Sequence, residues 1–178
     1  MNAISIIDKY YSDNAPLREL LITHSRLVTE KALHMAEAHP ELHIDTEFVS
    51  EAGMLHDIGI FLTDAPGIHC HGKDPYLCHG VLGAELMRKE GFPRHARVCE
   101  RHTGAGLTCE EIIKRNLPLP HRDFLPETAE EQLICFADKF FSKTRPTEEK
   151  TPEAARRSIV RFGEDGAQRF EAWVEKFM

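Results

Sequence analysis

Hydrophobic residues recur at helical spacing along most of the chain. Over residues 17–40 they follow one another at intervals of three and four, which predicts one long amphipathic helix. Asp45 is a typical N-cap residue and predicts a second helix over residues 45–59. The same spacing returns over residues 79–91 and, in a shorter segment, over residues 96–102. The hydrophobic spacing therefore predicts a mainly helical chain.

Capping motifs predict further helices in the second half of the chain. Thr108 with Glu111, and Thr128 with Glu131, each match the Thr-x-x-Glu capping box that begins a helix. Thr151 followed by proline predicts the start of a C-terminal tail of one or two helices. Residues 61–75 contain several prolines and glycines and show neither the helical nor the strand period, so we expect a long loop there.

Length and composition describe an ordinary globular protein. The chain has 178 residues, of which 42% are hydrophobic and 29% charged, and we expect one domain spanning residues 1–178. Its formal net charge of −7 argues against a broad surface for long nucleic acids, which are held mainly by clustered lysine and arginine. The net charge still permits a small anionic substrate, provided that basic residues cluster around its binding site.

The chain shows no sign of membrane insertion or secretion. No apolar run reaches the roughly 18 residues of a membrane helix, and the first residues lack the pattern of a secretory signal. We therefore expect a cytoplasmic protein without a membrane partner. The five cysteines are scattered and form no Cys-x-x-Cys pair, so reduced thiols are expected.

Six potential metal ligands lie on or beside apolar helical faces. They are His24, His56, Asp57, His79, His102 and Asp138. Burying an unpaired carboxylate is costly, so the two aspartates predict a nearby cation, either a basic side chain or a metal ion. A single histidine at such a position is commonly a core residue bonded to a carbonyl group, but the whole group favours a metal. Imidazole and carboxylate together suit iron, manganese, cobalt, nickel or zinc.

The order of these residues resembles a known signature. His24, then His56-Asp57 in the segment His-Asp-Ile-Gly, then Asp138 in Ala-Asp-Lys are similar to the H…HD…D signature of the HD superfamily of metal-dependent phosphohydrolases. The resemblance covers roughly residues 17–145. It implies an all-α fold, an HD-domain helical bundle to which residues 146–178 add a C-terminal helical extension.

The resemblance also implies a binuclear metal centre and a reaction. The first of two divalent transition-metal ions would be held by His24, His56, Asp57 and Asp138, and the second by Asp57, His79 and His102. Asp57 would bridge them; iron and manganese are favoured, while zinc, cobalt and nickel stay open. A metal-activated hydroxide would attack phosphorus without a covalent enzyme intermediate. The implied substrate is a phosphomonoester or phosphodiester of a nucleotide or related small metabolite.

Two features of related cyclic-dinucleotide phosphodiesterases are missing. Many of those relatives have a lysine directly after His-Asp-x-Gly and a Gly-Tyr-Pro segment downstream, whereas Ile60 follows Gly59 here and that segment does not occur. Cleavage of cyclic dinucleotides is therefore disfavoured, and the phosphate-facing cation must come from elsewhere. The candidates are Lys139, Arg101 and Lys73, with His69 and His71 as substrate-facing or proton-donating groups.

The basic residues near the C-terminus do not suggest a binding surface. Residues 143–150 are expected to form a linker, and the basic residues from Lys143 to Arg161 are interleaved with glutamates. This mixture predicts a solvated helix face.

Two other functions stay open beside the hydrolase. A metal-bound nucleotide-sensing module with little turnover is permitted by the missing lysine and by the lack of an obvious general acid. A structural or metal-storage protein is supported only by the eleven histidines, several of which lie outside the ligand set. The expected partner is a small phosphorylated, nucleotide-like molecule, and a homo-oligomer is left open.

Overall fold

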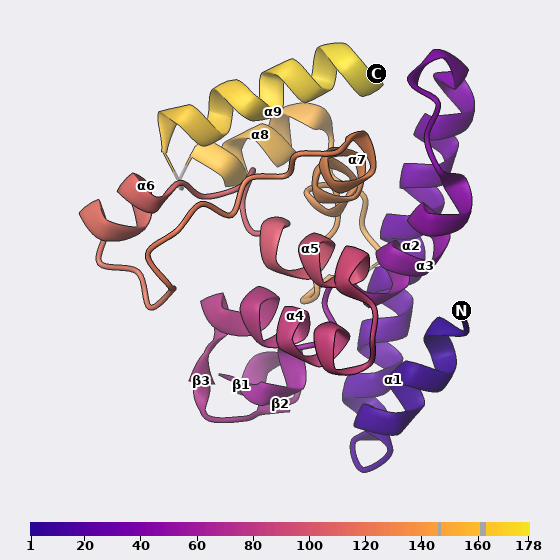
Figure 1. The fold of residues 1–178 in the computed structure, drawn as a ribbon, viewed down its shortest axis with the longest axis vertical. Helices are drawn as coiled ribbons and strands as arrows, with labels where there is room; N and C mark the ends of the chain where they lie inside the picture. The colour runs from indigo at the N-terminus through magenta and orange to yellow at the C-terminus, as the bar shows by residue number, and fades with distance from the viewer. Residues whose placement is uncertain (146, 161–162) are drawn as a thin grey trace.

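The computed structural model describes residues 1–145, 147–160 and 163–178. The described residues form nine α-helices, joined by turns and loops (Figure 1). Their bounds are α1 (Ala3–Tyr11), α2 (Ala15–Ala38), α3 (Thr46–Leu55), α4 (His79–Lys89), α5 (Pro93–Arg101), α6 (Cys109–Lys114), α7 (Ala129–Asp138), α8 (Pro152–Val160) and α9 (Glu164–Phe177). All the helices that the spacing and the caps predicted are present, and α1 is an additional one that neither signal predicted.

The two predicted capping boxes differ in the structure. At α6 the box is complete, because the Thr108 side chain accepts from the Glu111 N–H and the Glu111 carboxylate accepts from the Thr108 N–H. At α7 the Thr128 side chain accepts from the Glu131 N–H, but the Glu131 carboxylate turns to the N–H of Glu127 at 2.7 Å. Both helices begin where predicted, although only the first has the reciprocal pair of bonds.

A small β-sheet interrupts the helices between α3 and α4. Its strands are β1 (Thr63–Ala65), β2 (Cys70–His71) and β3 (Asp74–Pro75), in the order β2-β1-β3. β1 pairs antiparallel with β2 and parallel with β3. The prediction of an all-α chain with a loop over residues 61–75 is therefore wrong in this segment. Strands of two or three residues are too short to show a period of two in the sequence.

Helix α7 lies at the centre of the bundle. It packs against four other helices, α2, α3, α5 and α9. Figure 1 shows the tail helices α8 and α9 on one side of α7, with α4 and α5 on the opposite side. The rings of Phe136 and Phe170 are 5.1 Å apart and both are fully buried, so the apolar face of the tail belongs to the same core as α7.

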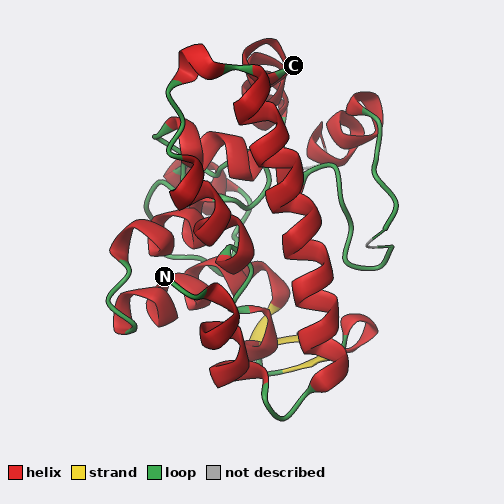
Figure 2. Cartoon of the chain, turned by 90° about the vertical axis from the view of Figure 1, so that its right-hand side faces the viewer, coloured by secondary structure: helices red, strands yellow, loops and turns green. Residues whose placement is uncertain are grey.

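Helix α2 is 24 residues long and runs along one side of the molecule (Figure 2). Its buried face includes Leu21, His24 and Val28, so a histidine enters the core among apolar neighbours. Charged residues occupy its outer face. Within the described ranges, no helix is both long enough and apolar enough to cross a bilayer.

The turn after α3 packs directly against α4. A Cβ atom added at Gly59 would lie 2.3 Å from the carbonyl oxygen of His79 and 2.4 Å from the backbone nitrogen of Gly83. Because both atoms belong to backbone, neither can move aside easily. Glycine at this position therefore allows the residues that follow α3 to approach the first turns of α4 closely.

We expect Gly59→Ala to destabilise the protein by about 1–3 kcal/mol, the usual cost of forcing an extra methyl group into a packed site. Urea unfolding followed by circular dichroism measures the change. Gly67→Ala is the matched control, because no atom lies within 4 Å of its added Cβ. Equal stability of the two variants would contradict the close packing of this turn.

Candidate metal centre

Helix ends bring the six predicted ligands together inside the bundle. His24 projects from within α2, whereas the other five lie at or next to a helix end. His56 and Asp57 follow α3, His79 opens α4, His102 follows α5 and Asp138 closes α7. Each of the six side chains belongs to a residue that is at most 9% exposed. Residues far apart in the sequence thus form one buried polar cluster.

One half of the cluster surrounds the Oδ2 side of Asp57. The Nε2 atoms of His24 and His56 lie 3.2 and 3.1 Å from this oxygen. His24 Nε2 also lies 3.0 Å from Asp138 Oδ1, and His56 Nε2 lies 3.5 Å from the same oxygen. The four side chains each offer one ligand atom within 4.8 Å of the others, a spacing that could hold a metal ion.

The other half of the cluster faces the second oxygen of Asp57. His79 Nε2 and His102 Nε2 lie 3.4 and 3.3 Å from Asp57 Oδ1. These three residues form a second group of potential ligands that shares only Asp57 with the first. The two oxygens of one carboxylate therefore face two different sets of histidines, which is the geometry that a bridging ligand requires.

Backbone carbonyl groups orient three of the histidine rings. The Nδ1 atoms of His56, His79 and His102 lie 2.6, 2.6 and 2.7 Å from carbonyl oxygens one turn earlier in the chain. A neutral ring that donates its Nδ1–H in this way carries a lone pair on Nε2. This is the tautomer of a metal ligand, held by a hydrogen bond on the opposite side of the ring.

The unsatisfied atoms of the cluster fit a bound cation. The Nε2 atoms of His79 and His102 are only 3.0 Å apart, so two lone pairs would face each other if both rings have this tautomer. His56 Nε2 and both oxygens of Asp57 are buried and have no hydrogen bond of acceptable geometry. A divalent ion would satisfy such atoms, whereas burying them without a partner is costly.

Lys143 adds positive charge to the cluster from the segment after α7. Its Nζ atom lies 2.5 Å from Asp57 Oδ2. Burial alone would raise the pKa of Asp57, but the charges of Lys143 and His56 outweigh it and hold the pKa well below its usual range. Burial would likewise lower the pKa of Lys143, and Asp57 instead raises it well above its usual value. The pair is therefore a buried ion pair.

The two ends of the cluster differ in charge. Burial lowers the pKa of His56, but the carboxylates of Asp57 and Asp138 more than offset it and raise the pKa to about 9. For His79, burial dominates and lowers the pKa to about 3. Burial lowers the pKa of His102 as well. His79 and His102 are therefore neutral at physiological pH, the protonation state in which imidazole binds metals.

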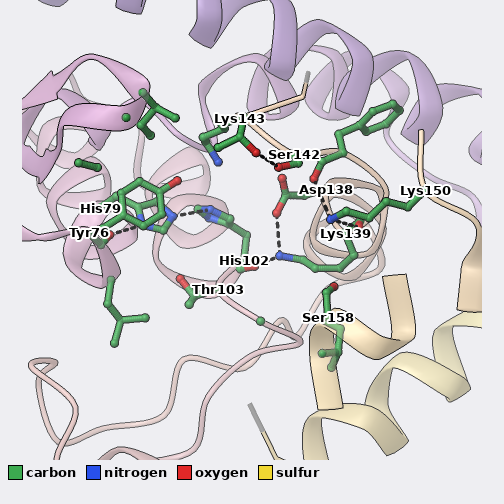
Figure 3. Close-up of a pocket in the computed structure, with 18 residues that line it drawn as sticks. Tyr76, His79, His102, Thr103, Asp138, Lys139, Ser142, Lys143, Lys150 and Ser158 are labelled. Carbon is green, nitrogen blue, oxygen red and sulfur yellow. Dashed lines mark hydrogen bonds and ion pairs between the residues drawn. The ribbon is translucent and has the colours of Figure 1, made fainter. Parts of the chain in front are cut away.

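A cavity of about 630 Å³ opens beside the cluster (Figure 3). Its wall combines potential ligands with ammonium and hydroxyl groups: His79, His102, Asp138, Lys139, Lys143, Lys150, Ser142, Thr144 and Ser158 all line it. Tyr76 also lines the cavity, and its ring stacks on that of His79 with 4.8 Å between the centroids. The cluster is therefore open to a small molecule on this side.

The predicted phosphate-facing groups lie in different places. Lys139 lines the cavity, with Nζ 2.6 Å from Asp138 Oδ2 and 2.8 Å from the His102 carbonyl oxygen. Arg101 instead donates to the Leu125 carbonyl oxygen and pairs with Glu127. His69, His71 and Lys73 are exposed. Arg101 and these three exposed residues are not among the described lining residues of the cavity.

The expectation of a linker and a solvated basic face over residues 143–150 is wrong for two lysines. Lys143 contacts Asp57, and Lys150 is partly buried in the cavity wall. Arg145 and Arg156 are exposed as expected, and Arg161 lies outside the described residues. No spacing pattern marks Lys143. The only signal in the sequence is its place a few residues after Asp138 and the pair Phe140-Phe141, at the end of a buried helix.

The helical bundle and its buried cluster of histidines and aspartates are typical of a protein that binds divalent metal ions. The HD domain family model matches residues 21–142, a range that contains all six of the predicted ligands. The chain belongs to the HD domain family. This membership supports metal-dependent hydrolase chemistry and, with the cluster, divalent metal binding.

Several curated proteins are similar to this chain. An uncharacterized protein of Methanocaldococcus jannaschii is 38% identical over 149 residues, which cover 82% of this chain and 77% of that protein. The tRNA (cytidine(56)-2'-O)-methyltransferase of Picrophilus torridus is 36% identical over 135 residues, covering 75% of this chain and 34% of the enzyme. The enzyme of the same name from Thermoplasma volcanium is 35% identical over 125 residues, which cover 70% of this chain and 32% of that enzyme. No solved structure matches the chain.

The chain thus spans about a third of the length of each of these two methyltransferases. About two thirds of each enzyme lies outside the region of similarity.

We expect the purified protein to carry about one to two divalent transition-metal ions per chain, and Asp57→Ala to lose most of them, because both ligand groups share Asp57. Elemental analysis of gel-filtered protein measures the metal content. His34→Ala, at an exposed position of α2, is the control and should leave it unchanged.

His79→Ala and His102→Ala should each remove about one ion and leave the fold intact, because the other ligand group and the core persist. Circular dichroism verifies the fold of each variant, and elemental analysis counts the ions. Full metal content in both variants would show that these two histidines form no separate site.

Proposed function

We propose that this protein is a metal-dependent phosphohydrolase that cleaves a phosphomonoester or phosphodiester of a nucleotide-like small molecule. The proposal rests mainly on one observation: a single cavity has potential metal ligands and lysine ammonium groups in the same wall. A phosphoryl group needs both, because negative charge on its oxygens must be neutralised during the reaction. The cavity volume of about 630 Å³ lies within the range of small-molecule sites.

Two overlapping sets of ligands support a binuclear centre. His24, His56, Asp57 and Asp138 would hold one ion, and Asp57, His79 and His102 the other. Bound divalent ions lower the pKa of water and withdraw charge from phosphoryl oxygens. Iron and manganese are the favoured metals for this mixture of imidazole and carboxylate, with zinc, cobalt and nickel as alternatives.

Lys139 and Lys143 orient the phosphoryl group in this proposal. Each ammonium carries three N–H donors. Lys139 directs one at Asp138 and a second at the His102 carbonyl oxygen, and Lys143 directs one at Asp57. The remaining donors are available to phosphate oxygens beside the cluster. Because these ammonium groups are largely buried, their interaction with an anion is less screened than at the surface. Arg101, His71 and Lys73 are not part of this proposal, since they lie outside the cavity wall.

The names of the two methyltransferase relatives do not decide the activity of this chain. The methyl transfer that they describe need not reside in the shared third of those enzymes. The net charge of −7 also disfavours binding of a long RNA by this chain. The hydrolase proposal instead follows from the potential metal ligands and Lys139, which lie inside the family match, and from Lys143, which comes directly after it.

We expect the metal-loaded protein to hydrolyse a generic phosphodiester or phosphomonoester, and a chelator to abolish the activity until metal is restored. Lys143→Met should lower kcat/KM by about 10²- to 10³-fold, the usual effect of removing one group that stabilises charge in the transition state. Metal content is measured in parallel. Lys89→Met, exposed on α4, is the matched control and should keep full activity.

Metal-free wild-type protein that still hydrolyses phosphate esters would contradict this function. Saturable nucleotide binding by the metal-loaded protein, without turnover across a panel of natural nucleotides, would instead favour a nucleotide-sensing module.

A further inference from the structure

Three ammonium groups gather around the carboxyl end of α7. Lys139 contacts Asp138 at 2.6 Å, and Lys143 contacts Asp57 at 2.5 Å. Lys150 donates to two backbone carbonyl groups just beyond the end of the helix, each at 3.3 Å. Figure 3 shows the three lysine side chains around one cavity. The negative end of the helix dipole favours cations at this place.

With divalent ions bound, the positive charge at the cavity would exceed what one phosphate group can balance. Among the described residues that line the cavity, Asp138 is the one that carries a carboxylate. The carboxylate of Asp57 lies in the same buried cluster as Asp138 but does not line the cavity. Lys139 and Lys143 pair with these two carboxylates, and Lys150 lies in the same wall. Each divalent ion adds two positive charges, whereas one terminal phosphate carries at most two negative charges. A substrate with further phosphate groups complements this site better.

Part of this wall comes from residues that follow the family match. The family match ends at residue 142, and two of the three lysines, Lys143 and Lys150, lie beyond it. The same tail contributes Thr144, Ser158 and Ile159 to the cavity. The tail is thus a wall of the cavity as well as a covering for the core.

Contacts of α9 hold the tail against the opposite side of the cavity. Arg169 donates to the carbonyl oxygens of Ala105 and Gly106 at 2.8 and 3.0 Å. The residues just before them, Thr103 and Gly104, line the cavity. Arg169 therefore links the tail to the loop that follows His102. This link holds the two parts of the cavity wall at a fixed distance from each other.

We propose that Thr144 and Lys150 belong to a second anion subsite in the cavity wall. In it, the Lys150 ammonium and the Thr144 hydroxyl group bind a phosphate group other than the one at the metal ligands. The inference rests on the proposed function and narrows its substrate to molecules with at least two linked phosphate groups, such as nucleoside diphosphates or triphosphates.

Calorimetric titration of the metal-loaded protein with orthophosphate and with pyrophosphate tests the subsite. We expect pyrophosphate to bind at least about tenfold more tightly, because its second phosphate gains a charge-assisted contact. Lys150→Met should reduce this preference to about twofold or less and leave orthophosphate affinity nearly unchanged. Lys89→Met is the control, and metal content after each titration shows whether pyrophosphate has removed ions.

Thr144→Val is a second variant, which keeps the test valid if Lys150→Met does not fold. It should lower pyrophosphate affinity by about threefold, the effect of one lost hydrogen bond, and leave orthophosphate affinity unchanged. Equal affinity of the wild type for the two anions would overturn the subsite, as would unchanged preference in both variants.

The two proposals fail in different ways. A wild type that hydrolyses phosphate esters but binds the two anions equally contradicts only the subsite. A wild type that prefers pyrophosphate but hydrolyses no phosphate ester contradicts only the hydrolase.

Discussion

The buried carboxylate of Asp57 is the group on which the rest of this structure depends. It is fully buried, and its two oxygens face different pairs of histidines. An ionised carboxylate inside a protein is tolerated only when positive charge surrounds it. Lys143 and the surrounding histidines supply part of this positive charge, and a bound cation would supply more.

Several features of the fold make such a centre feasible. Most of the ligands lie at helix ends, where the chain can turn a side chain toward a common point without breaking helical hydrogen bonds. Gly59 allows the turn after Asp57 to approach α4, which carries His79. Carbonyl groups one turn earlier orient the rings of His56 and His102. The bundle thus holds these side chains around a common point with its own hydrogen bonds, which would lower the cost of ordering them around an ion.

The family match and the cavity address different questions about function. The match covers the ligands and supports metal-dependent hydrolase chemistry. The cavity includes residues that follow the match, among them Lys150 and Ser158. In the proposed function, the part of the chain inside the match would hold the reacting centre, and the tail would shape the space for the remainder of the substrate. Selectivity would then differ between relatives whose tails differ, even when their metal ligands are the same.

The sequence by itself determined all the described helices except α1, and it indicated the six residues that form the buried cluster. Hydrophobic spacing and caps such as Thr108 depend on neighbours three or four residues apart, so they are readable along the chain. The order of His24, His56-Asp57 and Asp138 was readable for the same reason, because the signature is a linear one. Local patterns did not show the short strands around Thr63, which are too brief to display a period.

Only the tertiary structure decided which cations reach the cluster. Arg101 and Lys73 were as plausible as Lys139 from their neighbours in the sequence, yet Arg101 pairs with Glu127 and Lys73 is exposed. Lys143 looked like part of a linker and instead lies 2.5 Å from Asp57. A side chain's partner across the core depends on how the helices pack, and contacts between residues so far apart leave no periodic trace in a single sequence.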